Sequence, residues 1–406
     1  MGATADETVP EGAPPPPAFA PAELAARVGK VRRAMAARGL DALVVSDPSN
    51  MAWLTGYDGW SFYVHQAVVL GLAAGPIWFG RAQDAAGARR TTALPESAIA
   101  SYPDHYVQSP ERHPMAVLAG LLRDRGLGRG RVGVEMDNYY YSAKAHAVLG
   151  AGLPDAALPD ATGLVNWQRA VKSEAELALM RRAARIVERI HARIRDVAEP
   201  GLRKCDLVAE IYDAGLRFDP ATGTGGDYPA IVPLLPSGPD AAAPHLTWDD
   251  RPLRRGEGTF FEVAGVCRRY HCPLSRTVFL GRPPRAMLDA EGAVLEAMER
   301  GLDAARPGRT CGAVADAFFA VLARHGVAKP NRAGYPIGLS YPPDWGERTM
   351  SIRPGDRTVL EPGMTFHFMS GLWMRDWGLE ITESFAVTEG APECLAAVPR
   401  RLVVKD

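Results

Sequence analysis

A strong helix start divides this chain of 406 residues near residue 173. Ser173 is followed three residues later by Glu176, which is typical of a capping box at a helix N-terminus. Apolar residues then recur at helical spacing, at Met180, Ala184, Val187 and Ile190, until a Pro-Gly pair at 200–201 ends the pattern. We therefore expect one domain over residues 21–168 and a second over residues 169–406.

Length and composition agree with two domains. A chain of 406 residues, 47% of them hydrophobic, has more apolar residues than one compact core usually holds. The 46 Lys and Arg balance the 47 Asp and Glu, so the charge favours neither nucleic acid nor a membrane as a partner. We find no apolar run of transmembrane length and no secretion signal, and expect a cytoplasmic protein. The five scattered cysteines predict neither a disulfide framework nor a zinc knuckle.

Local patterns outline both domains. Residues 1–20 are proline-rich and predict a flexible tail. Helical and strand patterns then alternate as in an α/β domain, with helices expected near 21–38, 114–124 and 143–150 and strands near 42–45, 67–72 and 131–135. Asp47-Pro48-Ser49-Asn50 is typical of a turn. The second domain combines helices with β-rich hairpins, including a turn at 360–364 before a strand over 365–369.

One carboxylate interrupts the apolar segment Phe260-Phe261-Glu262-Val263-Ala264. A charged side chain in such a strand is costly unless it is paired, so we interpret Glu262 as functional rather than as an outward-facing residue of an edge strand. In Phe366-His367-Phe368, strand alternation turns His367 away from both phenylalanines, toward either a pocket or the core.

The stretch from Phe260 to Thr277 resembles the metal-binding hairpin of the pita-bread hydrolases, which include aminopeptidase P, prolidase and creatinase. Five further segments resemble motifs of the same superfamily in the same order, at residues 50–57, 171–174, 236–245, 334–338 and 360–364. This resemblance implies an α/β N-terminal domain followed by an α+β pita-bread domain of the creatinase/aminopeptidase type.

The resemblance also bears on metal binding. At the five positions where metal-dependent members carry their ligands, this chain has Glu262, Pro273, Tyr335, Met369 and Thr382. Divalent metals need several carboxylate or imidazole ligands in one shell, so we predict a metal-independent hydrolase without a cofactor. Glu380 and Glu383 are close to the last position; on one continuous strand they would face opposite sides, and one of them is expected to face the site.

Four long segments, at 228–233, 243–250, 341–348 and 371–384, resemble the ectoine hydrolase family more closely. Ectoine is a cyclic amidine that carries a carboxylate. The resemblance implies that the enzyme opens this ring to give an N-acetyl-2,4-diaminobutyrate. The sequence does not exclude hydroxyectoine as a second substrate. Glu262 would be the carboxylate beside the amidinium, as a nucleophile or as a base for water. His245, at the position of the family's active-site histidine, would be a general acid and base.

Aromatic side chains complete the candidate site. Planar cations favour aromatic faces, and a wall for the substrate could come from Tyr228, Tyr270, Tyr335, Trp345 and Trp377, with core packing as the alternative. The resemblance to creatinase-like dimers implies a homodimer in which the partner's N-terminal domain closes the site. Phe62 and His65, in an aromatic-rich segment over 60–66, are then candidates to act across the interface, or they serve surface packing.

Three other functions stay open. A metal-dependent Xaa-Pro peptidase would share the fold but needs metal ligands that this chain lacks, and metal analysis of the purified protein would separate the two functions. A creatinase-type amidinohydrolase is the nearest metal-free alternative. A non-enzymatic binding protein, as among histone-chaperone relatives, is disfavoured because Glu262 and His245 are retained and no acidic tail is present.

Overall fold

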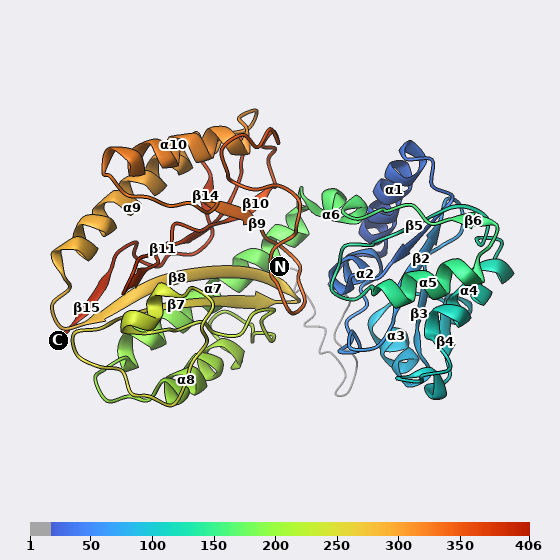
Figure 1. Ribbon diagram of the computed structural model, residues 1–406, viewed down its shortest axis with the longest axis horizontal. Helices are drawn as coiled ribbons and strands as arrows, with labels where there is room; N and C mark the ends of the chain where they lie inside the picture. The colour runs from blue at the N-terminus through green and yellow to red at the C-terminus, as the bar shows by residue number, and fades with distance from the viewer. Residues whose placement is uncertain (1–17) are drawn as a thin grey trace, which may run out of the picture. The chain divides into compact units, whose positions relative to one another are not determined.

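The computed structural model describes residues 18–406 and is shown in Figure 1. The tail predicted over residues 1–20 lies outside the described residues as far as residue 17. The chain divides into two compact units, with the division between Gln168 and Arg169. No helix within residues 18–406 is long and apolar enough to cross a membrane.

The first unit is built on one six-stranded sheet with the order β4-β3-β2-β1-β5-β6. Its strands are β1 (Ala42–Val45), β2 (Ala67–Gly71), β3 (Ile77–Arg81), β4 (Ile99–Tyr102), β5 (Gly130–Val134) and β6 (Ala156–Ala157). β1 pairs antiparallel with β2 and parallel with β5. Mixed pairing of this kind, with helices between strands, is the α/β arrangement that the alternating patterns predicted.

Both faces of this sheet are covered by helices (Figure 1). Alternate side chains of β1 enter two different cores: Leu43 and Val45 join the core of α1 (Pro21–Ala37), α2 (Pro48–Thr55) and α3 (Ala85–Thr91), while Ala42 and Val44 join that of α4 (Pro114–Asp124) and α5 (Ala143–Gly152). A strand buried on both faces has no polar alternation, which explains the uninterrupted apolar run. Short helices η1 (Ala82–Asp84), η2 (Glu96–Ala98), η3 (Asp104–Tyr106) and α6 (Leu164–Arg169) complete the unit.

The turn predicted at Asp47–Asn50 is wrong, because these residues begin helix α2. Asp47 is the N-cap, and its Oδ1 accepts hydrogen bonds from the backbone N–H groups of Ser49 (2.8 Å) and Asn50 (3.3 Å). An Asp-Pro-Ser sequence serves a turn and a helix start equally well, since both use the side chain as an acceptor. Asn50 then donates from Nδ2 to the buried carboxylate of Glu135 at 2.6 Å, which fixes the helix to the end of β5.

The second unit begins with the predicted helix, α7 (Glu174–Val197). Its capping box is present in both directions: Ser173 Oγ accepts from the Glu176 N–H at 3.2 Å, and a Glu176 carboxylate oxygen accepts from the Ser173 N–H at 2.9 Å. The helix packs against α8 (Lys204–Leu216) and against the hairpin of β7 and β8. A Cβ at Gly265 of β7 would lie 2.0 Å from the Ala183 carbonyl oxygen, so glycine allows the strand to touch the helix backbone.

The predicted hairpin consists of β7 (Gly258–Cys267) and β8 (Tyr270–Leu280), with β15 (Val403–Lys405) added parallel to β8. Its two loop residues, Arg268 and Arg269, have φ angles of 50° and 66°, as a tight two-residue hairpin turn requires. Every residue of both strands is buried. In the antiparallel pairing of the two strands, Glu262 of β7 lies opposite Ser275 of β8.

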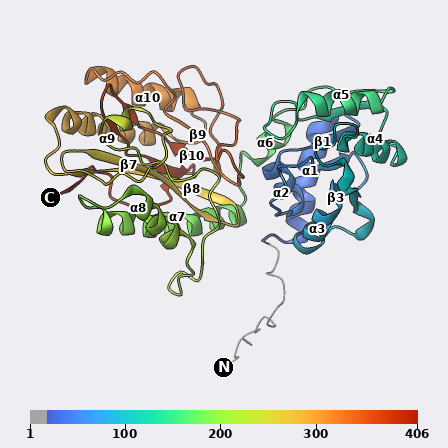
Figure 2. The same cartoon turned by 60° about the horizontal axis from the view of Figure 1, so that its bottom comes forward.

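A second sheet has the order β14-β13-β10-β9. Its strands are β9 (Gly334–Pro336), β10 (Thr365–Phe368), β13 (Glu383–Ala386) and β14 (Glu393–Cys394); β11 (Leu372–Trp373) and β12 (Gly378–Leu379) form a separate pair. Helices α9 (Arg285–Ala304) and α10 (Cys311–Arg324) pack on one side of the strands, and α7 and α8 lie on the other (Figure 2). This α+β arrangement was predicted, but the expected continuous strand over 378–383 was not found: β12 ends at Leu379, and β13 begins at Glu383.

Candidate active site

A buried chain of hydrogen bonds crosses the second unit. Trp345 Nε1 donates to Tyr335 Oη at 2.9 Å, Tyr335 Oη lies 2.9 Å from His367 Nδ1, and His367 Nε2 lies 2.8 Å from Thr382 Oγ1. Burial lowers the pKa of His367 to about 3, so the ring is neutral, and its one donor and one acceptor nitrogen match these two neighbours. The alternation of β10 positions His367 here, because Phe366 and Phe368 enter the core beside α9 and α10.

Glu262 lies next to this chain in the middle of β7, with 4% of its surface exposed. Its backbone forms a two-bond bridge with Leu234, which fixes the position of the strand. Burial raises the pKa of the Glu262 carboxyl well above its ordinary value, and the charges of Glu380 and Asp344 raise it further. Burial also raises the pKa of Tyr335, with Glu262 as the next cause, so the phenol stays protonated beside the carboxyl.

Glu380 provides a second buried carboxyl, just after β12. Its backbone N–H bonds to Thr277 Oγ1 of β8 at 2.8 Å, and its Oε1 accepts from Trp373 Nε1 at 2.9 Å. Burial raises the pKa of Glu380 to about 7, against the opposing effects of the Ser275 hydroxyl, Trp373 and Lys329. Within residues 18–406, neither Glu380 Oε2 nor Ser275 Oγ has a hydrogen-bond partner of ordinary geometry, although the Ser275 hydroxyl is close enough to affect the Glu380 carboxyl.

Glu262 and Glu380 therefore act as a carboxyl pair. Burial raises the pKa of both carboxyls, and the charge of Glu380 raises that of Glu262 further, so ionisation of both groups at once is disfavoured. A pair in this state offers one carboxylate and one carboxylic acid. Such a combination supplies a base or nucleophile together with an acid, and its single negative charge is suited to a cationic ligand.

Lys329 is a site residue that the sequence analysis missed. Its ammonium group donates to the Gly371 carbonyl at 2.8 Å and lies 5.0 Å from the ring centroid of Trp373. Burial lowers its pKa to about 7, and Glu380 counteracts this effect. The loop around Lys329 has no recognisable motif, so nothing local in the sequence could have selected it. Asp344 and Trp373 were within family-like segments but were not singled out.

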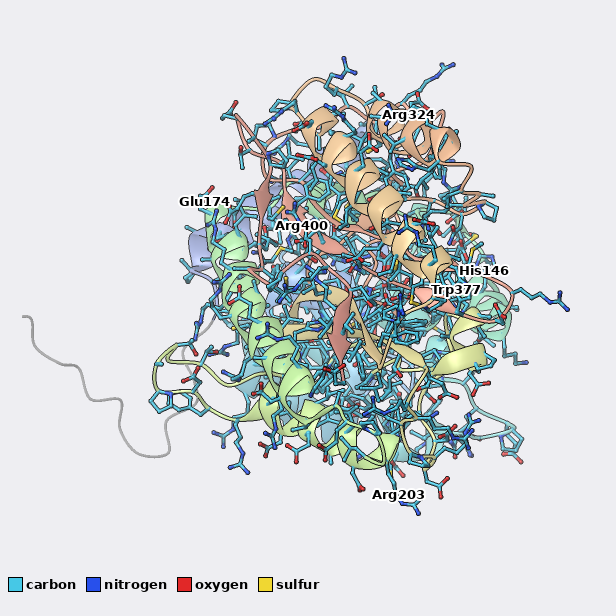
Figure 3. All side chains as sticks on the ribbon, turned by 90° about the vertical axis from the view of Figure 1, so that its left-hand side faces the viewer. His146, Glu174, Arg203, Arg324, Trp377 and Arg400 are labelled. Atoms are coloured by element: carbon cyan, nitrogen blue, oxygen red, sulfur yellow. The ribbon has the colours of Figure 1, made fainter. Side chains whose placement is uncertain are left out.

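Two predicted site residues are bound by other groups of the protein. Glu383 is bound by two arginines: Arg276 Nη2 donates to its Oε1 at 2.6 Å, and Arg400 Nε, labelled in Figure 3, lies 3.0 Å away. Tyr270 donates from its hydroxyl to Glu176 at 2.7 Å, within the capping box of α7. These contacts tie Glu383 Oε1 to two arginines and the Tyr270 hydroxyl to helix α7, which favours a framework role for both residues.

The other aromatic candidates are spread over the unit. The guanidinium carbon of Arg269 lies over the ring of Tyr228, 3.6 Å from the ring centroid. Trp377, on the loop between β11 and β12, is half-buried against the core of α9 and α10 (Figure 3). Of the predicted aromatic wall, the structure thus brings only Tyr335 and Trp345 into the hydrogen-bonded chain beside Glu262.

His245 is exposed on the loop after η4 (Gly238–Ala242). Among residues 18–406, no hydrogen bond or ion pair joins it to either member of the carboxyl pair. Helix η4 does pack against both β7 and β12, the strands next to Glu262 and Glu380. The assignment of His245 as an acid and base stays a prediction.

Phe62 and His65 belong to the first unit. Phe62 is half-buried, with its ring centroid 4.6 Å from that of Trp60 and 5.9 Å from that of Tyr140. His65 lies beside His113, and burial lowers its pKa to about 4. Each thus has packing partners within its own unit, and an action across a dimer interface stays a prediction.

The two units and the hairpin-centred site define the class of protein. Residues 27–171 match the Creatinase/Prolidase N-terminal domain, and residues 178–389 match metallopeptidase family M24. The chain therefore belongs to the M24 family, in the branch with a creatinase/prolidase N-terminal domain, and the predicted family and pita-bread fold class are confirmed.

Individual relatives narrow the comparison. The chain is 59% identical over 392 residues to a protein named ectoine hydrolase from Halomonas elongata, covering 95% of this chain and 98% of the relative. It is 46% identical to the uncharacterized hydrolase/peptidase y4tM of Sinorhizobium fredii, covering 96% and 99% of the two chains. Among solved structures, dipeptidase PepE from Mycobacterium ulcerans matches with a TM-score of 0.78 and 25% identity, covering 95% of this chain and 99% of that one.

The residues of this chain do not fit the metal centre that the family name implies. Pro273, at one expected ligand position, is paired in the hairpin and presents only its carbonyl, which accepts from Ser384 Oγ at 2.5 Å. Tyr335 and Thr382, at two others, are hydrogen-bonded to His367. Within the described part of the chain, no group of three or more His, Cys, Asp or Glu side chains could hold a metal ion.

Proposed function

We propose that this protein hydrolyses ectoine, opening its cyclic amidine ring to an N-acetyl-2,4-diaminobutyrate without a metal ion. The buried pair of Glu262 and Glu380 is the observation that carries the proposal, because its single negative charge complements an amidinium. The 59% identity to the Halomonas elongata protein, over nearly the whole of both chains, supports ectoine as the amidine.

The reaction requires an oxygen on the amidine carbon and a proton on the leaving nitrogen. Glu262 either attacks the carbon itself, followed by hydrolysis of the glutamyl intermediate, or takes a proton from a water that attacks. In both routes one ring C–N bond breaks, the carbon keeps the new oxygen as an amide carbonyl, and the freed nitrogen becomes an amine. With Glu262 in one of these roles, we assign the acid for this nitrogen to Glu380, the other buried carboxyl of the pair, in its protonated state.

The hydrogen-bonded chain from Trp345 to Thr382 positions the reacting groups without adding charge. His367 is neutral, and Tyr335 is held between it and Trp345. The Tyr335 ring therefore stays beside Glu262, and neither Tyr335 nor His367 adds a charge to that of the carboxyl pair. We assign His245 a second proton-transfer role, which is supported by its position in the family motif and by the packing of η4 against β7 and β12.

We further propose a homodimer in which Phe62 and His65 reach the partner's site. Support comes from the aromatic cluster of the first unit, where Phe62 packs against Trp60 and Trp60 is 56% exposed. Large exposed aromatic side chains are enriched at protein interfaces. Twofold assembly is the commonest closed form of a homo-oligomer.

The function is tested by incubating the purified protein separately with ectoine, hydroxyectoine, creatine and an Xaa-Pro dipeptide, and following each reaction by proton NMR. We expect ring-opened, N-acetylated product from ectoine, and no cleavage of creatine or of the dipeptide. Two-dimensional spectra of the product identify which nitrogen carries the acetyl group. Cleavage of the dipeptide with no turnover of ectoine would refute the proposal.

A further inference from the structure

A cleft of about 560 Å³ opens in the second unit between the loop that precedes β9 and the segment around residue 353. This volume is in the range of small-molecule sites. Its lining includes Lys329, Arg332 and Arg353 and contains no carboxylate. Because Lys and Arg balance Asp and Glu over the whole chain, three basic side chains without an acid are a local feature that favours an anionic ligand.

Lys329, which lines the cleft, is near enough to the carboxyl pair for the charge of Glu380 to act on it. Its ammonium donates to the Gly371 carbonyl at 2.8 Å and to Asn331 Oδ1 at 2.9 Å, which leaves one of its three N–H groups. The same ammonium lies over the ring of Trp373, and Trp373 Nε1 donates to Glu380 at 2.9 Å. The cleft and the carboxyl pair are thus separated by one indole ring.

Arg332 links the cleft to the hydrogen-bonded chain on the Glu262 side. Its guanidinium carbon lies 4.5 Å from the centroid of the Tyr335 ring, and its Nη1 donates to Ser351 Oγ at 3.2 Å. Among the residues from 18 to 406, it forms no ion pair and no other hydrogen bond. Most of its five N–H donors therefore remain for a ligand, in the fork geometry that binds a carboxylate through both oxygens.

We propose that this cleft binds the carboxylate of the substrate, with Arg332 as the bidentate anchor and Lys329 as a second donor at its inner end. A ligand held in this way places the rest of its structure over Tyr335, toward Glu262. The naming of the ligand as ectoine rests on the proposed function, whereas the binding of a small carboxylate does not. Neighbouring cationic and anionic regions then match a zwitterion that carries a carboxylate and an amidinium.

The test compares two substrates, ectoine and 2-methyl-1,4,5,6-tetrahydropyrimidine, the same cyclic amidine without the carboxylate. In Arg332→Gln, we expect the ratio of kcat/KM for ectoine to that for the amidine to fall about 10- to 100-fold, mainly through the KM of ectoine. Arg332→Lys keeps the charge but not the fork and should restore part of the ratio. Arg324→Gln is the matched control, since Arg324 is exposed and pairs with Glu296 (Figure 3); its ratio should equal that of the wild type.

An equal loss on both substrates, or an unchanged ratio in Arg332→Gln, would overturn the assignment of Arg332 as the anchor. If the wild-type protein does not turn over ectoine, the proposed function fails, and the cleft is tested separately by calorimetry. The probes are then pipecolate, a cyclic amino acid with a free carboxylate, and its amide. Binding of pipecolate but not of the amide, and its loss in Arg332→Gln, supports the carboxylate site; no binding of pipecolate to the wild type refutes it.

Discussion

Replacing Glu380 by glutamine should make the protein more stable at pH 8 while impairing catalysis. The buried carboxyl has a pKa of about 7 in the folded state, against an ordinary value of 4.5. Below pH 4.5 it is protonated in both the folded and the unfolded chain and does not affect the free energy of unfolding. Between pH 4.5 and 7 only the unfolded chain releases the proton, so stability falls as the pH rises, and above pH 7 the full destabilisation is present.

The size of the effect follows from this difference in pKa. At about 1.4 kcal/mol for each unit of pKa, a rise from 4.5 to about 7 corresponds to about 3 kcal/mol at pH 8. Glutamine has no charge to desolvate, and its Oε1 can still accept from Trp373. Lys329 loses a neighbouring carboxylate, which offsets part of the gain, so we expect a net increase in the free energy of unfolding of about 1–2 kcal/mol.

Glu383→Gln is the matched control, since the same change is made three residues away at an equally buried carboxyl. Here the carboxylate is bound by Arg276 and Arg400, and its removal leaves the buried Arg276 without its counter-ion. Breaking a buried pair in this way costs about 3 kcal/mol or more. The two variants should therefore change stability in opposite directions at pH 8.

Urea denaturation at pH 5, 6.5 and 8, followed by fluorescence and circular dichroism, measures both variants against the wild type. The gain from Glu380→Gln should be largest at pH 8 and disappear toward pH 5, whereas Glu383→Gln should be destabilised at all three values. A loss of stability in Glu380→Gln at pH 8, or a gain that does not depend on pH, would refute the assignment of Glu380 as a carboxyl with a raised pKa.

Three further outcomes are expected. Glu262→Gln should lower kcat by several powers of ten with an unchanged circular dichroism spectrum, because an amide is neither a nucleophile nor a base; more than a tenth of the wild-type rate would exclude Glu262 as either. Activity should survive exhaustive chelation, with less than stoichiometric metal in the purified protein; loss with chelator and recovery with manganese would contradict metal independence. Mixing Glu262→Gln with Phe62→Ala subunits, each nearly inactive alone, should restore up to about half of the activity per dimer, since one site then carries both changes and the other neither. No recovery despite proven subunit exchange would show that Phe62 does not act in the partner's site.

Local sequence patterns were sufficient for much of the framework. The capping box at Ser173 and Glu176 specified the start of α7, because both partners are three residues apart and need no other part of the chain. Strand alternation turned His367 away from Phe366 and Phe368, and the structure shows it buried and bonded to Tyr335 and Thr382. Glu262 could be selected because a single carboxylate in an apolar strand is informative wherever the strand packs.

The roles of the other carboxyls were decided only by the tertiary structure. Glu380 and Glu383 are both buried glutamates of one segment, and what separates them is the identity of their distant neighbours: Trp373 and Lys329 for one, Arg276 and Arg400 for the other. The break between β12 and β13, which removed the expected alternation, is likewise invisible in the residues themselves. Desolvation and pairing depend on which segments meet in space, and no local pattern contains that information.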